Sequence, residues 1–364
     1  MYHSFRYALV GAALGTLSTT SFADGVSLYG ELDSGLAYVD NVAGRSQLQT
    51  TSGLIDGSFW GLQGSEDLGA GAKALFRLEH GYSVTSGEDL NDHPAYVGLQ
   101  SDTFGTVTLG HQYDLVHDYF APFTLTGGTG GTAFAHPLDN DNANNSWLAA
   151  NALKYASASY GGFTFGGMYA FSNGAGGFAG NRAYGFGLNY GHGPFNAGAA
   201  WMLNDGRGST RSGAYDPLQL PGSGGALINA SVRKQDVIGA GASYALGDVT
   251  VAGAWSRAIH TGVMDVDSAQ ASPSVAFSNY EVSAVWQMTS AVSLAGMYVY
   301  THASPAHWHQ GAVQSVYALS KRTDVYAEAI YQRASAGGVA MVYGIDRSAG
   351  RAQLVVTSGI RHRF

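Results

Sequence analysis

Apolar and polar residues alternate along almost the whole chain with a period of two. In the segment 26–38 the apolar residues share one parity, while Glu31 and Asp33 lie on the other. A later segment repeats the pattern, with Lys73 and Arg77 on its polar face. Such alternation predicts strands with one apolar and one polar face. Charges on an inner face cannot form a dry core without partners, whereas a water-filled lumen accepts them and surrounding lipid explains the apolar face.

The chain after Ala23 contains no run of about 20 apolar residues, so no transmembrane helix is predicted. Only helices and closed barrels can span a bilayer, because every backbone polar group must be paired there. Charged residues make up 12% of the sequence, about half the usual quarter for a soluble domain. The low charge argues against disorder. The choice between a soluble secreted protein and a β-barrel, which needs no apolar run, rests on the period of two.

Composition excludes several other classes of protein. There is no cysteine, which excludes a disulfide scaffold and a thiolate metal site. The net charge of −8 argues against nucleic-acid binding, which normally requires a basic face. We therefore expect no nucleic-acid partner and no cofactor.

Residues 1–23 have the features of a secretory signal peptide. Arg6 provides the positive start, residues 7–17 form an apolar core, and Ser21 and Ala23 place small residues at the cleavage site. We predict cleavage before Asp24, which leaves residues 24–364 as one β-barrel domain.

Predicted turns alternate between short and long. Short connections such as 65–69 and 320–323 alternate with long ones such as 113–148 and 303–309. Outer-membrane barrels have short periplasmic turns and long external loops. Our assignment, with one strand starting at Leu54, gives roughly sixteen strands, an even number as expected for a single-chain bacterial barrel.

Several stretches resemble the trimeric general porins of Gram-negative outer membranes, of the β-proteobacterial type. They run in order from the first predicted strand to the last: VSLYGELDSGLAY (26–38), WGLQGSEDLGAGAKALFRLEHG (60–81), VGLQSDTFGTVTLGHQYD (97–114), NALKYASASYGGF (151–163), YALSKRTDVYAEAIYQR (317–333) and GIRHRF (359–364). The resemblance implies a homotrimer of sixteen-stranded antiparallel barrels in the outer membrane, in contact with lipid and lipopolysaccharide. It also implies passive diffusion of ions and small hydrophilic solutes, with the third long loop folded into each lumen.

The predicted constriction departs from the arginine-lined pattern that the resemblance implies. Positions where relatives carry a base hold Glu31, Phe59 and His111 here, and also Ala150 or Asn144, depending on the alignment register. His111 shares the outward parity of Leu109, so a bulge near Gly110 would be needed to turn it inward.

The remaining candidate pore-lining residues are bases on the wall and acids on the inserted loop. The wall bases are Lys73, Arg77 and Lys154, and the loop acids are Asp114, Asp118, Asp139 and Asp141. Opposed charges in a narrow pore select ions by sign. With few bases left, we predict a pore that is weakly selective or prefers cations.

The inserted loop is expected to carry a short helix within Tyr113–Phe123, ended by Pro122. The glycine cluster 127–131 lacks the Lys-Ser/Thr ending of a phosphate-binding loop and is interpreted as a turn. His307 and His309 could bind a metal, but their predicted loop position favours incidental chelation. No motif orients a nucleophile, so no catalytic residue is assigned.

Three functions are compatible with these patterns. The first is a passive diffusion channel, with a solute-specific porin as a narrower variant. The second is a soluble secreted β-sandwich or propeller that binds glycans through its aromatic residues. The third is an outer-membrane enzyme built on a barrel. The resemblance favours the first.

Overall fold

The computed structural model describes residues 25–90, 93–175, 180–206, 218–221 and 227–364. The predicted signal peptide lies outside these residues. Within them, no helix has the length and apolar character needed to cross a membrane.

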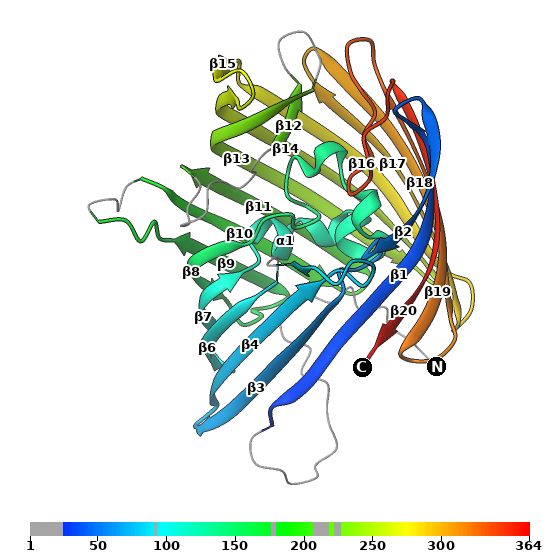
Figure 1. Cartoon of the computed structure of the whole chain (residues 1–364). Helices are drawn as coiled ribbons and strands as arrows, with labels where there is room; N and C mark the ends of the chain where they lie inside the picture. Colours follow the sequence, from blue (N-terminus) through cyan, green and yellow to red (C-terminus); the bar gives the residue numbers. More distant parts are fainter. Residues whose placement is uncertain (1–24, 91–92, 176–179, 207–217, 222–226) are drawn as a thin grey trace.

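Sixteen long antiparallel strands form one closed barrel (Figure 1). Each pairs with its neighbours in sequence order, and the last strand pairs with the first, from Glu31 opposite Arg363 to Val39 opposite Val355. The strands are β1 (Ser27–Val42), β3 (Phe59–Gly69), β4 (Ala72–Tyr82), β6 (Ala95–Ser101), β7 (Gly105–Gln112), β8 (Ala149–Ala156), β9 (Phe163–Ala170), β10 (Arg182–His192), β11 (Phe195–Asp205), β13 (Leu227–Leu246), β14 (Val249–Asp265), β16 (Val275–Gln287), β17 (Val292–Ala303), β18 (Ala306–Ala318), β19 (Thr323–Ala334) and β20 (Ala352–Arg363).

Four further strands among the described residues each pair with one of these sixteen strands. They are β2 (Arg45–Ser52), β5 (Asp89–Leu90), β12 (Leu218–Pro221) and β15 (Gln270–Ser272), which pair with β1, β4, β13 and β14. β2 pairs with the same part of β1 that pairs with β20, so it continues the line of β3 along the wall after the interruption at 53–58. None of the four changes the number of wall strands. The predicted sixteen-stranded fold is therefore confirmed, and the soluble sandwich or propeller is excluded.

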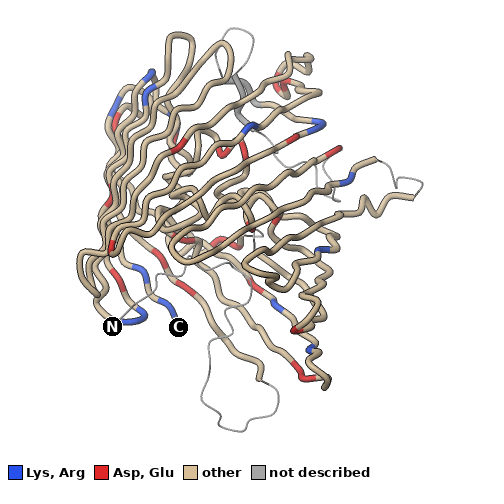
Figure 2. The backbone as a smooth tube through the Cα atoms, turned by 180° about the vertical axis from the view of Figure 1, so that it is seen from behind, with Lys and Arg blue, Asp and Glu red and all other residues tan. Residues whose placement is uncertain are grey.

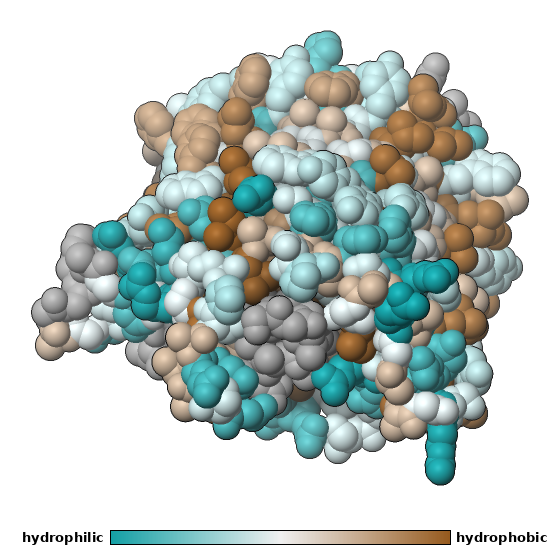
Figure 3. Space-filling model, turned by 90° about the horizontal axis from the view of Figure 1, so that it is seen from above, coloured by the Kyte–Doolittle hydropathy of each residue, from teal (hydrophilic) through white to brown (hydrophobic). Residues whose placement is uncertain are grey.

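The wall has the predicted two faces. On β16, Val282 is 61% exposed on the outside, whereas its neighbour Glu281 is 3% exposed on the inside. β19 shows the same alternation, with Asp324 and Glu328 buried inside and Tyr331 exposed outside. Long stretches of the wall carry neither acid nor base (Figure 2). From above, hydrophilic residues spread across the end that carries the long loops (Figure 3).

Several sequence-based boundaries were wrong, and two of them bear on the predicted site residues and loops. The strand predicted from Leu54 begins at Phe59, and the preceding residues turn inward, where the backbone N–H of Ile55 donates to the Asp33 carboxylate at 2.8 Å. The predicted long loop at 303–309 is a tight turn, because β17 ends at Ala303 and β18 begins at Ala306. His307 and His309 therefore lie on a strand, where a side-chain pattern of period two continues.

Residues 113–148, here named loop 3, lie inside the ring of strands (Figure 1). The loop contains α1 (Leu115–Tyr119) and several short helical turns up to Asp139. α1 contacts the inner sides of β9, β10, β11 and β13. Further along, Gln310 of β18 donates to the carbonyl oxygen of Ala135 at 3.1 Å. Loop 3 thus follows the inner wall over about half of the barrel.

The last long connection, residues 335–351, also packs inward. The indole N–H of Trp308 donates to the carbonyl oxygen of Val339 at 3.0 Å, and Gln353 accepts from the backbone N–H of Val342 at 2.8 Å. This connection approaches loop 3, because a side chain at Gly344 would meet Thr132. Two inward segments therefore support each other on the β18–β20 side.

The two faces of β16 give a direct test of the barrel in lipid. We expect Val282→Lys to weaken folding into bilayers by about 2–4 kcal/mol, because it places a charge against hydrocarbon near mid-strand. The neighbouring Ser283→Lys, on the inner face, is the matched control and should cost much less. Urea titration of folding into vesicles measures both. Equal costs for the two variants would contradict the assignment of faces.

Candidate functional site: the constriction

Loop 3 is tied to the barrel wall by a buried cluster of charges. His136 lies between two carboxylates, with Nδ1 2.7 Å from Asp141 Oδ2 and Nε2 3.1 Å from Glu281 Oε2. All three side chains are fully buried. Glu281 belongs to β16, so the imidazole joins the loop to the wall. We call His136, Asp141 and Glu281 the loop clasp.

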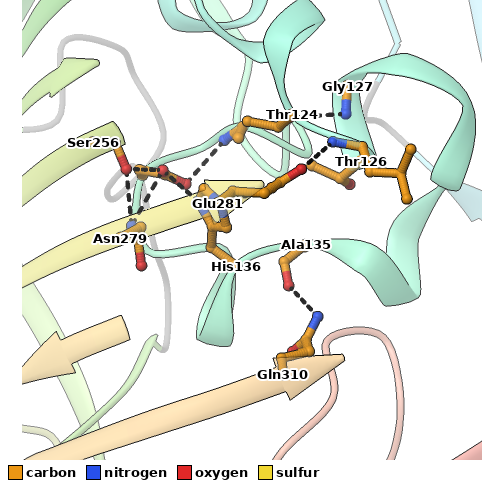
Figure 4. Close-up of polar contacts among 12 residues, drawn as sticks. Thr124, Thr126, Gly127, Ala135, His136, Ser256, Asn279, Glu281 and Gln310 are labelled. Carbon is orange, nitrogen blue, oxygen red and sulfur yellow. Dashed lines mark hydrogen bonds and ion pairs between the residues drawn. The ribbon is translucent and has the colours of Figure 1, made fainter. Parts of the chain in front are cut away.

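Neighbouring polar groups complete the clasp (Figure 4). The second carboxylate oxygen of Glu281 accepts from the backbone N–H of Leu125 at 2.7 Å, and Ser256 donates to Asp141. Asn279 and Asn140 exchange side-chain hydrogen bonds of 2.8 and 3.2 Å. Both ring nitrogens and all four carboxylate oxygens of the clasp have at least one hydrogen-bond partner, which is a condition for a buried charged network to stabilise a structure.

The clasp holds its histidine in the charged form. Burial alone would lower the pKa of His136, but the adjacent carboxylates of Asp141 and Glu281 raise it to about 10. Despite its own burial, the pKa of Asp141 is lowered, chiefly by His136. An imidazolium with an ionised Asp141 is therefore the stable state at neutral pH.

Glycines on the wall allow loop 3 to lie close to the strands. A Cβ atom at Gly187 of β10 would lie 2.3 Å from the Tyr119 ring, and one at Gly239 of β13 would lie 2.6 Å from the Phe120 ring. Any larger residue would push the loop toward the pore axis. Tyr119 and Phe120, at the end of α1, therefore pack directly on the backbone of these glycines.

The opposite wall carries Tyr29, Phe59, Arg77 and Glu79 on its inner face. Tyr29 donates to Glu79 Oε1 at 2.6 Å, and Arg77 Nε donates to the same oxygen at 2.7 Å. Phe59 pairs with Glu31 in the sheet, so both side chains point inward. The inward directions expected for Phe59 and Arg77 agree with this geometry.

Glu31 pairs with bases that the sequence reasoning missed. Arg363 Nε lies 2.9 Å from Glu31, and Arg361 lies 2.7 Å from Asp56. Asp324 of β19 bonds to both arginines. The sequence does contain a signal for these two bases. Residues alternate in GIRHRF (359–364), and Arg361 and Arg363 fall on the face opposite to that of the exposed Ile360.

Two predicted pore-lining acids are structural supports instead. Asp33 is fully buried, and its carboxylate accepts from Tyr326 and from the backbone N–H groups of Ile55 and Asp56, so it fixes the inward turn. Asp114 caps α1 by accepting from the backbone N–H of His117 at 2.9 Å. Burial raises the pKa of Asp114 to about 6.

Asp139 and Asp141 are likewise buried within loop 3. Asp139 accepts from the backbone N–H groups of Asn144 and Ser146, which closes the return of the loop. Burial, together with the nearby charge of Asp141, raises the pKa of Asp139 to about 6. These acids shape the loop and do not line its open side.

Asp118 and Lys154 are brought together as a pair at the edge of the lumen. Lys154 Nζ donates to Asp118 Oδ2 at 2.7 Å and to the carbonyl oxygen of Tyr113 at 2.9 Å. Although burial acts in the other direction, Lys154 and His117 hold the pKa of Asp118 below its usual range. The base and the acid predicted for this edge therefore neutralise each other.

His111 and Lys73 lie apart from the charge pairs described above. His111 pairs directly with Ala95 and shares the outward face of Leu109. An irregularity does occur between Gly110 and Gln112, but it lies in the pairing with β8 and leaves His111 outward, so a pore-lining role does not fit. Lys73 lies opposite Asp67, near a short turn, on the inner face.

A sixteen-stranded barrel with an apolar exterior and an enclosed third loop defines an outer-membrane protein of the porin type. Residues 8–337 match the family model described as Gram-negative porin. The chain therefore belongs to the Gram-negative porin family and is an outer-membrane protein. Because porins are channels rather than enzymes, the prediction of no enzymatic activity is confirmed.

Curated relatives come from β-proteobacteria. An outer membrane porin of Bordetella pertussis is 32% identical over 188 residues, which is 46% of this chain and 48% of the relative. Outer membrane porin protein 32 of Delftia acidovorans is 31% identical over 178 residues, 46% and 50% of the two chains. The chain thus spans about half the length of these relatives.

Solved structures share the fold over nearly the whole chain. An anion-selective porin from Comamonas acidovorans superposes with a TM-score of 0.75 at 23% identity, covering 94% of this chain and all of that one. OmpF of Salmonella typhi gives a TM-score of 0.64 at 16% identity, with 94% and 98% coverage. At such identities the likeness establishes the fold.

Removing the clasp cation should destabilise the barrel and free loop 3. We expect His136→Leu to cost about 3–5 kcal/mol, because two buried carboxylates lose their counterion. His302→Leu, an exposed histidine on the outward face of β17, is the control. Unfolding of the purified protein measures stability, and single-channel current noise reports loop motion. Equal stability of the two variants would argue against the clasp.

The clasp also predicts a pH dependence. The folded-state pKa of His136, about 10, lies above its unfolded value of about 6.5, so its contribution is fully present below about 6.5. That contribution is lost as the pH rises through about 10. We expect the difference in unfolding free energy between native protein and His136→Leu to be constant from about pH 5 to 6.5 and to shrink toward pH 10. A difference that grows in alkali would contradict the assignment.

Proposed function

We propose that the barrel is a water-filled channel for passive diffusion of ions and small hydrophilic solutes across the outer membrane. Membership in the porin family and the polar inner face of β1, β4 and β19 support this function. The protein is exported after removal of residues 1–23 and assembles as a homotrimer among outer-membrane lipid and lipopolysaccharide. These last expectations rest on the sequence features and on the resemblance to trimeric porins.

We further propose that the constriction is weakly selective, with at most a preference for cations. The observation that carries this proposal is charge pairing: Arg77 contacts Glu79, Lys154 contacts Asp118, and Arg363 contacts Glu31. A base whose field is compensated by an acid a few ångströms away attracts a passing anion only weakly. The solved porin from Comamonas acidovorans is an anion-selective porin, which is a property of that protein.

A purified preparation in planar bilayers tests this function. We expect stepwise ohmic currents and a reversal potential near zero, or slightly toward cations, under a salt gradient. Strong anion preference would overturn the selectivity. Membranes that remain electrically silent would overturn the channel itself.

Splitting one charge pair should shift selectivity in opposite directions. We expect Asp118→Asn to favour anions, because Lys154 is left uncompensated, and Lys154→Gln to favour cations. A free charge about 4 Å from a passing ion is worth about 1 kcal/mol in water, or an about fivefold change in permeability ratio. Reversal potentials at low salt measure the shifts. Shifts of the same sign would contradict a location of this pair at the constriction.

A further inference from the structure

Aromatic rings gather on the inner wall of β1 and β3, beside the guanidinium of Arg77 on β4. The Phe59 ring lies 5.2 Å from the His93 ring and 5.8 Å from the Tyr29 ring, edge to face. The Arg77 guanidinium lies 5.8 Å from the centre of the Tyr29 ring. Strands β1, β3 and β4 therefore present rings and a stacked guanidinium side by side.

Loop 3 adds further rings on its own side. The Arg77 guanidinium interacts electrostatically with Tyr113, which is the first residue of the loop. Tyr113 in turn stacks on His117 of α1, with ring centres 4.1 Å apart and planes at 19°. We call these residues the ring series: His93, Phe59, Tyr29, Arg77, Tyr113 and His117. All six are half-buried, so each keeps part of its surface accessible.

The local backbone makes room for this arrangement. A Cβ atom at Gly61 would lie 2.8 Å from Glu79 Cγ and 3.1 Å from the Tyr29 ring. Glycine at this position therefore lets the Tyr29 ring cross from β1 over β3 to reach Glu79. The series is built into the wall and does not arise from chance contacts at a flexible surface.

At both ends of the ring series lie charged side chains, each paired with a side chain of opposite charge. Lys154 and Asp118 lie beside Tyr113 and His117, and Glu31, paired with Arg363, lies beside Phe59 in the sheet. Such pairs offer donors and acceptors without a strong net field. Half-buried rings bordered by neutralised polar groups suit a solute with a flat apolar face and a rim of hydroxyls.

Resting on the proposed channel function, we infer that the ring series is a sugar-binding track, which favours passage of pyranose sugars over flexible polyols of equal size. The C–H face of a pyranose packs on an aromatic ring, and its hydroxyls bond to the flanking pairs. An open-chain polyol has similar hydroxyls but no rigid face, so it gains less from the rings. The preference follows from shape and contact rather than from charge.

Liposome swelling with glucose and with sorbitol tests this inference, because the two solutes have nearly equal mass and hydroxyl number. We expect glucose to enter faster, by about threefold, the size of one favourable aromatic contact. Phe59→Leu and, independently, Tyr113→Leu should bring the two rates together. Tyr317→Leu, an exposed tyrosine on the outer face of β18, is the matched control and should leave the difference intact.

The outcomes separate the two proposals. If neither solute enters and bilayers carry no current, the channel function fails. If both solutes enter at equal rates through the native protein, or if neither substitution reduces a difference, the channel stands and the sugar track is wrong. If the substitutions slow benzoate but leave the glucose preference, the rings bind aromatic acids and the inference is overturned.

Discussion

Closure of β20 on β1 is the constraint on which the rest of the structure depends. In hydrocarbon every backbone N–H and C=O must be paired, and a sheet meets this condition only when its last strand pairs with its first. The register set by that closure places Arg363 opposite Glu31 and Arg361 opposite Asp33. The same backbone pairing that makes the barrel stable in lipid therefore supplies a counterion for Glu31, whereas Arg361 pairs with Asp56 and Asp324.

Within this ring, loop 3 is fixed by polar chemistry rather than by apolar packing alone. The clasp of His136, Asp141 and Glu281 joins the loop to β16, while Tyr119 and Phe120 pack on wall glycines nearby. A buried charged network has one satisfied geometry, whereas apolar contacts tolerate sliding. Loop 3 is thereby held to one side of the lumen in a defined position.

Local pattern predicted much of the fold, because alternation acts between near neighbours. The inner faces of β1, β4 and β19 followed from period two. A short helix was expected within 113–123, but the capping role of Asp114 came only from the structure. Partners distant in sequence did not follow. Asp33 looked like a pore acid until the inward turn at 53–58 brought Ile55 to it, and the role of His136 required β16, more than a hundred residues away.

The clasp and the ring series together explain why shape would dominate over charge in this pore. The clasp holds loop 3 against β14 and β16, and Tyr113 at the start of the loop interacts electrostatically with Arg77 on β4. Arg77, Lys154 and Arg363 are each paired with an acid, and a matched pair exerts little field beyond its own dimensions. A passing solute then contacts mainly ring surface and hydrogen-bonding groups. These contacts discriminate between solutes by how well the shape of each solute fits them.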